Sequence, residues 1–288
     1  MITREITEYF VFMTWCFGKN PEQLSSGILQ TKTRRRRCAI ADAALICSLP
    51  NGKRKPDAYV IVFVSVIIPA LNEEEPIAGV VRECFATGVP HEVIVVDNGS
   101  ADRTAERARE AGARVATAPR GYGRACAAGF RALSPECEIV VFLDGDGSDC
   151  PEFMPQLVDL IAAGKFDFVI GSRTRGQREP DSMNFQQVFS GRIVGMLVRM
   201  LYGVRYTDMC PFRAIRRDAL GNLNMREQTY GWNLEMQMKA ARAGLRILEI
   251  PVNHRRRAGG QSKVSGTLRG TFVAGARILA TLVRVALE

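Results

Sequence analysis

The fold of this chain is decided by the stretch Val140-Val141-Phe142-Leu143-Asp144-Gly145-Asp146. Its apolar residues are typical of a buried strand, and two carboxylates follow where that strand would end. On a strand, residues i and i+2 share a face, so Asp144 and Asp146 can point the same way while Gly145 lets the backbone turn. Such a pair suits a divalent cation that also binds phosphate oxygens. Asp-Gly-Asp is also typical of ordinary turns, so the rest of the chain has to decide.

The rest of the chain repeats one order: a strand, a polar loop, then a helix. The pattern predicts strands over residues 64–69, 91–96, 113–116, 138–143 and 166–171, and helices over 74–86, 102–111, 124–133 and 151–163. Ser100 is predicted to cap the second helix. Strands that alternate with helices form parallel βαβ units, which predicts an α/β, Rossmann-like, mostly parallel sheet flanked by helices. Polar loops then gather at the carboxyl edge, where open α/β sheets bind ligands.

Length and composition restrict the class of protein. The chain has 288 residues, 47% of them hydrophobic, and can bury a full core. Its formal net charge of +9 favours anionic partners, namely nucleic acid, an anionic membrane surface or phosphorylated substrates. The 8 cysteines form no CxxC pair and no zinc spacing, so reduced thiols are expected. No run approaches the roughly 18 uncharged apolar residues that a membrane span needs.

The first 60 residues differ from the rest. Four consecutive arginines, Arg34 to Arg37, precede an apolar stretch in the order of a signal peptide, but they lie far from Met1 and Asp42 interrupts the apolar part. The basic run could bind nucleic acid or lipid, although a solvated tail fits better. The sequence therefore predicts a poorly ordered extension over residues 1–60, the main folded domain over 61–265 and a C-terminal amphipathic helix over 266–288.

Two common nucleotide-binding signatures are missing. A dinucleotide fold needs GxGxxG directly after its first strand, but here Ala70-Leu71-Asn72-Glu73 follows that strand. The pair of glycines in Gly121-Tyr122-Gly123 comes after the third strand and lacks the third glycine. A P-loop is absent as well. NAD binding is therefore disfavoured.

Three segments resemble family 2 glycosyltransferases of the GT-A fold. They are residues 64–74 (VSVIIPALNEE), the strand 93–96 with its loop Asp97-Asn98-Gly99-Ser100, and Asp144-Gly145-Asp146. The resemblance extends over about residues 62–270. It is nearest to the polyprenyl-phosphate sugar synthases, such as dolichyl-phosphate mannose or glucose synthases. Three later segments support that subgroup: Gly171-Ser172-Arg173, residues 208–214 (DMCPFRA) and Gly260-Gln261-Ser262-Lys263.

The chain departs from the family pattern at two positions. Asn98 stands where the family often has a second aspartate, which leaves the base contact expected of Asp97 intact. Ser148 stands where the subgroup often has glutamine after the metal-binding aspartates, which puts a third protein ligand in doubt.

The resemblance implies roles for particular residues. Asp144 and Asp146 would bind Mg²⁺ or Mn²⁺ at the diphosphate, where the cation neutralises the leaving group. Glu73 could instead be a helix N-terminal charge, and Arg173 and Lys263 could be solvated. The residues expected to bind the nucleotide sugar are Pro69, Ala70, Leu71, Asn72, Glu73, Asp97, Gly121, Asp144, Gly145, Arg173 and Lys263.

The acceptor determines whether a general base is needed. A phosphomonoester is already anionic at neutral pH and can attack unaided, whereas a hydroxyl needs a base. For a hydroxyl, Asp208 or Glu235 is the expected base, and the candidate catalytic residues are thus Asp146, Asp208 and Glu235. Asp208 could equally cap a turn, and Glu235 could be an ordinary residue of a helix over 233–243. Trp232 could stack on a sugar or belong to the core.

Two later segments carry arginines seven residues apart in otherwise apolar sequence. These are Arg192 and Arg199 within residues 192–202, and Arg277 and Arg284 within residues 271–287. The spacing places each pair on one helix face, which favours interfacial helices whose arginines meet the headgroups of an anionic membrane surface. The alternative is core helices whose arginines extend to water.

Taken together, the residues and the resemblance predict an inverting, metal-dependent glycosyltransferase. It would move a sugar from a UDP- or GDP-sugar to a polyprenyl phosphate, at the cytoplasmic face of a membrane to which it binds peripherally. Transfer to a soluble hydroxyl acceptor is the first alternative. Sugar nucleotidyl transfer is the second, although the chain lacks the glycine-rich basic first loop usual for that reaction. No nucleic-acid partner is expected.

Overall fold

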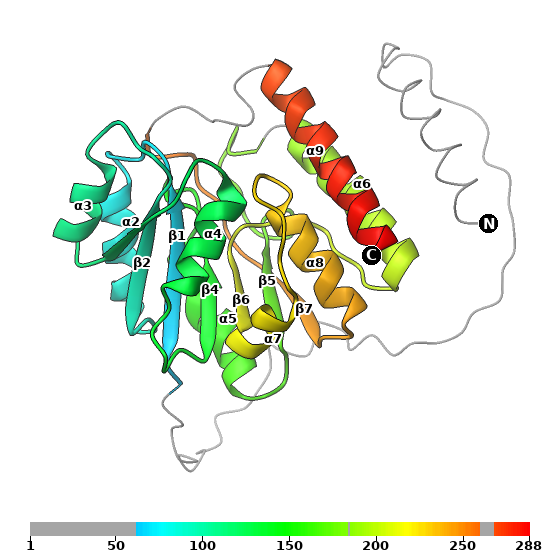
Figure 1. Ribbon diagram of the computed structural model, residues 1–288, viewed down its shortest axis with the longest axis horizontal. Coiled ribbons are helices and arrows are strands. Elements are labelled where there is room, and N and C mark those ends of the chain that lie inside the picture. Colours follow the sequence, from blue (N-terminus) through cyan, green and yellow to red (C-terminus); the bar gives the residue numbers. More distant parts are fainter. Residues whose placement is uncertain (1–61, 184, 260–267) are drawn as a thin grey trace, which may run out of the picture. The chain divides into compact units, whose positions relative to one another are not determined.

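The computed structural model describes residues 62–183, 185–259 and 268–288 (Figure 1). The extension predicted over residues 1–60 lies outside the described residues, as does the whole motif Gly260-Gln261-Ser262-Lys263. The described residues all belong to one compact unit that begins at Ala58.

In the described residues, seven strands form one sheet in the order β3-β2-β1-β4-β6-β5-β7. Among these strands, β6 alone runs antiparallel to its two neighbours, β4 and β5. The predicted α/β class, with a mixed and mostly parallel sheet, is thus confirmed. The strands are β1 (Val64–Ala70), β2 (Glu92–Asp97), β3 (Arg114–Thr117), β4 (Ile139–Phe142), β5 (Phe168–Ser172), β6 (Arg213–Arg216) and β7 (Ile247–Pro251).

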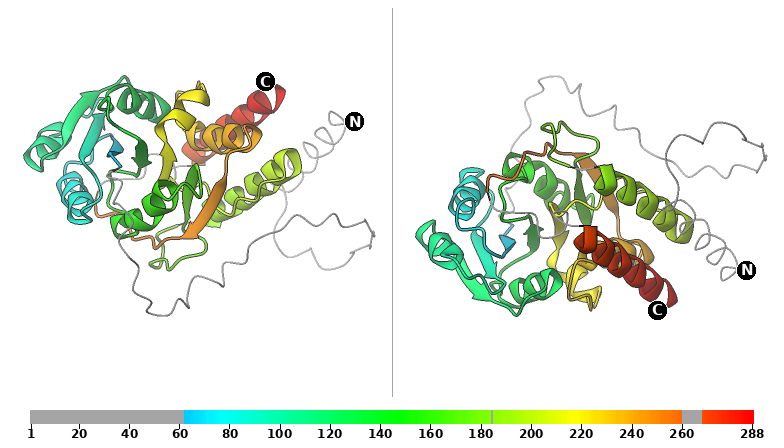
Figure 2. Two further views of the ribbon diagram at one scale, coloured as in Figure 1. Left: turned by 90° about the horizontal axis from the view of Figure 1, so that it is seen from below. Right: turned by 90° about the horizontal axis from the view of Figure 1, so that it is seen from above.

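Helices lie on both faces of this sheet, as the two views of Figure 2 show. Every residue of β1 and of β4 is buried, which is why these strands read as unbroken apolar runs. The helices are α2 (Ile77–Ala86), α3 (Thr104–Glu110), α4 (Tyr122–Arg131), α5 (Met154–Ala162), α6 (Phe185–Tyr202), α7 (Arg217–Asn222), α8 (Trp232–Arg242) and α9 (Leu268–Leu287), with a 3-10 turn at Pro151–Phe153 before α5.

One predicted helix cap is wrong. Ser100 does not cap α3, because its Oγ accepts the N–H of Asn72 at 2.9 Å in the neighbouring loop. The N-cap of α3 is Arg103, which makes no capping bond with its side chain. The N–H of Thr104, the first residue of α3, donates to Oδ1 of Asp102, one residue before the N-cap, at 3.0 Å. Asp102 thus accepts from the first turn of the helix, whereas Ser100 accepts within the loop.

The arginines of α9 do not behave as the lipid-facing interpretation expects. Arg284 is only 35% exposed and pairs with Glu235 at 3.1 Å and Glu288 at 2.9 Å. Arg277 is exposed, but its Nη1 donates to Thr229 Oγ1 at 3.1 Å. This pair is therefore used to dock α9 against the domain. Arg192 and Arg199 on α6 are both exposed.

Apolar side chains remain on the outside of α6 and α9, which both contact α8. Within the described part of the chain, no helix has the length and apolar character to cross a membrane. The exposed large apolar residues of these two helices are Phe189, Met196, Met200, Leu201, Leu279 and Leu287.

Candidate active site

The loops after β1 and β2 are joined at the carboxyl edge of the sheet. Ala70 and Asp97, the last residues of the two strands, are paired in the ladder, and the N–H of Asn98 donates to the carbonyl of Ala70 at 2.9 Å. Asn72 has a left-handed backbone, with φ of 51°, and its Oδ1 accepts the N–H of Ala101 at 2.8 Å. The predicted nucleoside-binding residues 69–73 and Asp97 thus lie side by side.

Asn98 connects this pair of loops to the third one. It is buried, and its Oδ1 accepts the N–H of Gly121 at 3.0 Å. Gly121 has φ of 141°, and a Cβ there would collide with the carbonyl oxygen of Gln228. Asn98, which stands where the family often has aspartate, therefore serves as a hydrogen-bond acceptor for Gly121. Position 121 needs glycine because of its backbone conformation and the nearby carbonyl of Gln228.

The loop after β4 holds Asp144 by two contacts. Tyr122 Oη donates to Asp144 Oδ1 at 3.2 Å, and the N–H of Asp144 donates to Asp149 Oδ2 at 2.9 Å. Asp149 is almost fully buried. The sequence reasoning missed Asp149 as a part of the site. Its presence in the same short polar run as Asp144 and Asp146 was the available signal.

The electrostatics of this loop show an excess of negative charge. Burial raises the pKa of Asp144, and the neighbouring Asp149 and Asp146 raise it further. Burial also raises the pKa of Asp149. His254 supplies no compensating charge, because burial lowers its pKa to about 4 although its Nδ1 lies 4.0 Å from Asp149 Oδ1. A nearby cation stabilises the ionised form of carboxylates that are crowded in this way.

Arg173 and Asp208 form a two-pronged ion pair. Arg173 Nε and Nη2 donate to the two carboxylate oxygens of Asp208 at 2.8 Å each, and the N–H of Arg173 donates to Oδ2 at 2.9 Å. Burial alone would raise the pKa of Asp208, but Arg173 outweighs it and holds the pKa below its usual range. Asp208 is therefore kept ionised by a partner that it would have to release in order to accept a proton.

Arg257 contacts two of the predicted site residues at once. Its Nη1 donates to Asp146 Oδ2 at 2.7 Å, and its Nη2 pairs with Glu73 Oε1. Asp146 Oδ1 accepts hydrogen bonds from the backbone N–H of Ser148 at 2.9 Å and from its side-chain hydroxyl at 2.6 Å. Sequence reasoning missed Arg257, because it stands in a run of three arginines and such runs are typical of solvated surface. We refer to Glu73, Asp144, Asp146, Asp149 and Asp208 as the acidic edge.

Glu235 has a different role from the predicted one. It is fully buried, accepts the N–H groups of Arg226 and Glu227, and pairs with Lys239 at 3.0 Å and Arg284 at 3.1 Å. A general base has to reach the acceptor's proton. The enclosed Glu235 carboxylate cannot, so it is removed from the candidate bases.

The model of the family described as "Glycosyl transferase family 2" matches residues 65–223, more than half of the chain. The chain belongs to glycosyltransferase family 2. An uncharacterized glycosyltransferase of Mycobacterium tuberculosis is 37% identical over 214 residues, which cover 73% of this chain and 94% of that protein. The dolichyl-phosphate hexose transferase of Haloferax volcanii is 35% identical over 235 residues, which cover 80% of this chain and 96% of that protein.

Solved structures agree with this assignment. Glucosyl-3-phosphoglycerate synthase of Mycobacterium tuberculosis, in complex with Mn²⁺, UDP-glucose and phosphoglyceric acid, superimposes with a TM-score of 0.65 at 25% identity. The match covers 78% of this chain and 80% of that one. The fold is thus of the GT-A type, and the protein is a glycosyltransferase.

The acidic edge of this glycosyltransferase fits a divalent cation in one particular way. Among residues 62–183, 185–259 and 268–288, no three His, Cys, Asp or Glu side chains are grouped as a complete metal site. Mg²⁺ is often bound by one or two carboxylates, with substrate phosphates and water as the other ligands. Asp144 and Asp146, with their neighbours' uncompensated charge, fit that mode. Ser148 Oγ is engaged with Asp146 rather than free as a third ligand.

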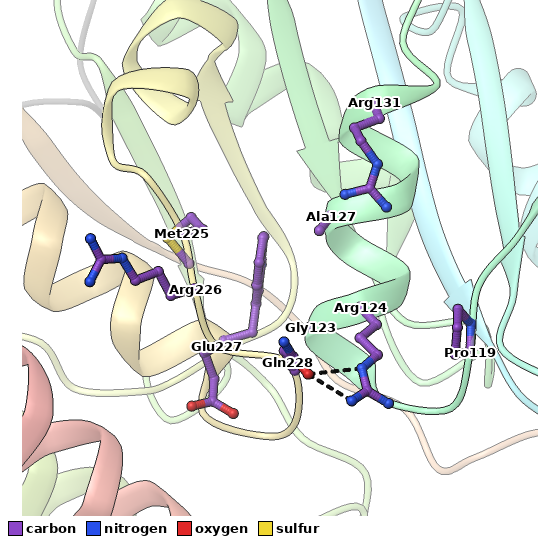
Figure 3. A pocket seen from close by; sticks show the side chains of 10 residues that line it. Pro119, Gly123, Arg124, Ala127, Arg131, Met225, Arg226, Glu227 and Gln228 are labelled. Atoms are coloured by element: carbon purple, nitrogen blue, oxygen red, sulfur yellow. Dashed lines mark hydrogen bonds between the residues drawn. The ribbon is translucent and has the colours of Figure 1, made fainter.

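A separate cavity of about 530 Å³ lies between α4 and residues 225–228 (Figure 3). Arg124 Nε and Nη2 donate to Gln228 Oε1 across it, at 3.0 and 2.7 Å. Trp232 lines the cavity but is only 3% exposed, in agreement with the core interpretation. None of the acidic-edge residues line this cavity. The glycosyltransferase thus has two separate features: the acidic edge at the strand ends, and the cavity between α4 and residues 225–228.

Proposed function

We propose that this glycosyltransferase moves a sugar from a UDP- or GDP-sugar to a polyprenyl phosphate, in one inverting displacement assisted by Mg²⁺ or Mn²⁺. The donor would lie along the carboxyl edge, with its nucleoside at residues 69–73 and Asp97 and its diphosphate near Asp144 and Asp146. The cation supplies charge neutralisation of the leaving diphosphate. The main support for this donor site is that these loops meet at one edge of the sheet.

The acceptor is inferred from the state of the two candidate bases. Asp208 is committed to Arg173 by three hydrogen bonds, and Glu235 is enclosed by protein. An acceptor that brings its own negative charge needs neither of them. A phosphomonoester meets this condition, and the name of the Haloferax relative supports a polyprenyl carrier.

Arg173 has a suitable position for the acceptor's phosphate. It interacts electrostatically with Asp144 and Asp149 as well as Asp208, so it is a fixed cation beside the acidic edge. An arginine can bind a phosphate through two parallel hydrogen bonds. We infer that Arg173 screens the incoming phosphate from these carboxylates.

A peripheral membrane contact would bring the enzyme to such a lipid. We propose that α6 provides it, because Met196 and Met200 are exposed one turn apart and Arg192 and Arg199 are exposed on the same helix. Each basic residue near an anionic surface contributes about 1 kcal/mol, and this contribution falls as salt rises. The contact would be at the cytoplasmic face.

Flotation with vesicles tests this contact. The protein should float with anionic vesicles at low salt and less with neutral ones. Replacing Met196 and Met200 by glutamine should weaken flotation, while Phe85→Gln, at an exposed apolar residue of α2, should not. Equal flotation of both variants would contradict docking through α6.

Product release distinguishes the acceptors. The protein is incubated with a panel of UDP- and GDP-sugars, and release of the nucleoside diphosphate is followed with and without a short polyprenyl phosphate. The proposal expects one donor whose turnover depends on the lipid phosphate and on Mg²⁺ or Mn²⁺. A polyprenol without phosphate is the control and should not be used. Turnover with the polyprenol alone would contradict the phosphate acceptor.

A second candidate is transfer to a soluble hydroxyl acceptor. The structural likeness to glucosyl-3-phosphoglycerate synthase, solved with UDP-glucose and phosphoglyceric acid, favours it. In that case Asp208 would have to leave Arg173 to act as base. Lipid-independent turnover with 3-phosphoglycerate, lost in Asp208→Asn, would support this candidate over the first.

A further inference from the structure

Arg257 joins two loops that the proposed function assigns to the donor. It binds Asp146, which lies 111 positions away in the sequence, and Glu73, which lies 184 positions away. The Arg257 side chain is 24% exposed, and those of Glu73 and Asp146 are 7% and 12% exposed. A guanidinium presents its donors in a rigid fork, so it sets the separation of the two carboxylates. One side chain thus pairs with both of them, and its single positive charge offsets one of the two negative charges.

The backbone that carries Arg257 is anchored beside Asp146. The N–H of Arg255 donates to the carbonyl of Ser148 at 2.9 Å, and the N–H of Ala258 donates to the carbonyl of Asp146 at 3.0 Å. A Cβ on Gly147 would lie only 3.1 Å from the Cβ of Ala258. The main chain is therefore held in place, while the guanidinium stands at the end of a flexible stem. Arg257 can exchange partners without movement of the main chain.

The contacts of Asp146 set a competition. A carboxylate has about four lone-pair positions. In Asp146, two are used by Ser148 and one by Arg257. A divalent cation that approaches Asp146 meets a guanidinium at the same carboxylate, and like charges at this distance repel strongly where water is scarce. Pairing with Arg257 and binding of a cation therefore oppose each other.

A diphosphate changes this competition, because a guanidinium group binds phosphate oxygens at least as well as it binds carboxylate oxygens. We propose that Arg257 is an exchangeable counter-ion, which pairs with Asp146 and Glu73 in the donor-free enzyme and moves to the diphosphate when the nucleotide binds. Asp146 then accepts the divalent cation only together with the nucleotide. This proposal rests on the proposed function, because it takes Asp146 as a cation ligand. Arg257 is in this sense a positioning residue.

The consequence is reciprocal coupling: nucleotide raises the affinity for the cation by the same factor as the cation raises that for nucleotide. The experiment follows binding of Mn²⁺ through the electron paramagnetic resonance signal of the free ion, with UDP, with GDP and with neither. The wild-type protein should bind Mn²⁺ weakly alone and at least about tenfold more tightly with one of the nucleotides. No sugar transfer is needed for this measurement.

Substitutions then identify the residue responsible. Arg257→Gln removes the charge, and should bind Mn²⁺ alone about tenfold more tightly than the wild type, with the coupling factor reduced towards one. Arg257→Lys keeps the charge but cannot span both carboxylates, and should lie between the two. Arg256→Gln is the matched control, because the Arg256 side chain donates to the carbonyl of Pro180 and to Asp181 instead. It should keep the wild-type coupling.

The outcomes separate this proposal from the proposed function. If the wild type binds no Mn²⁺ even with UDP or GDP, the metal-dependent function itself is contradicted. If it binds Mn²⁺ equally well with and without nucleotide, or if folded Arg257→Gln matches Arg256→Gln in Mn²⁺ affinity, the exchange by Arg257 is overturned and the metal site stands. Should Arg257→Gln not fold, Arg257→Lys decides, and a nucleotide-free affinity equal to that of the wild type overturns the proposal.

Discussion

The acidic edge and the contact between α8 and α9 both bury acids beside arginines, yet their charge balance differs. At the acidic edge, five carboxylates face two described guanidinium groups, those of Arg173 and Arg257. Between α8 and α9, three carboxylates face four cations; we call this set the α8–α9 cluster: Glu227, Glu235, Glu288, Arg226, Lys239, Arg242 and Arg284.

The difference separates a binding site from a structural contact. In the α8–α9 cluster every charge has a partner, and the ion pairs hold the C-terminal helix to the domain. At the acidic edge the surplus of carboxylates raises the pKa of Asp144. That surplus is unfavourable in the free protein and would be relieved by the cation that the proposed function requires. Uncompensated charge is therefore the better guide to the site than buried charge as such.

The largest effect is expected for Asp146→Ala. Transfer should fall by at least about a thousandfold, because the cation would lose one of its two proposed protein ligands. The thermal midpoint should change little or rise, since a carboxylate leaves a crowded group. Nucleoside diphosphate release and thermal unfolding measure the two effects, with the exposed Asp159→Asn on α5 as the control. Wild-type activity after removal of all metal would contradict the assignment.

In the α8–α9 cluster the same kind of change should cost stability instead. Glu235→Gln leaves the buried Lys239 without its nearest carboxylate, and should lower the free energy of unfolding by about 3–5 kcal/mol. Urea denaturation measures this loss. Activity per folded molecule should remain close to that of the wild type. A stable but inactive Glu235→Gln protein would break the comparison and restore Glu235 as a catalytic candidate.

Burial of His254 beside the acidic edge should also make stability depend on pH. The pKa of His254 is lowered to about 4 in the folded protein, from about 6.5 when unfolded. Between these values the unfolded chain binds the proton and the folded one does not, so this histidine lowers stability by about 3 kcal/mol as pH drops from about 6.5 to 4. Asp144 and Asp149 act in the opposite direction, because their raised pKa values let the folded protein bind protons that the unfolded chain does not.

Unfolding free energies at several pH values test this by comparing the wild type with His254→Gln, which should gain stability relative to the wild type as pH drops from about 6.5 to 4. A stability difference between the two proteins that does not change with pH would show that His254 does not contribute to the acid sensitivity.

The smallest effect is expected for Asn98→Asp. The carboxylate keeps an acceptor for the N–H of Gly121, so the free energy of unfolding should change by less than about 1 kcal/mol. Asn98→Ala leaves that N–H without its partner and should cost about 1–3 kcal/mol. The free energies of unfolding of the two variants, measured by urea denaturation, show how much one added negative charge at this edge of the sheet changes stability. Equal losses would show that the hydrogen bond to Gly121 is not the important contact.

Local patterns predicted most of the fold. The alternation of strands and helices was correct from β1 to β5, because each element buries a face whose period is visible in a short window. β6 and β7 were not predicted. Their place depends on pairing with β4 and β5, residues far away in the sequence, and β6 enters antiparallel where no local residue specifies the direction.

The same distinction between local patterns and long-range contacts applies to the candidate site. The order of the residues was enough to predict that Asp144 and Asp146 follow a buried strand and that the loops after β1 and β2 meet, because carboxyl ends of neighbouring parallel strands share one edge. β4 ends at Phe142, so the two aspartates lie in the loop beyond it, and the prediction that they share a strand face does not apply. The contacts of Arg257 with Glu73 and Asp146, of Arg173 with Asp208, and of Glu235 with Lys239 and Arg284 became visible only in the folded chain. The cause is the range of the interactions. Strand and helix patterns are set by neighbours a few residues apart, whereas an ion pair depends on which of many arginines reaches a given carboxylate across the folded chain.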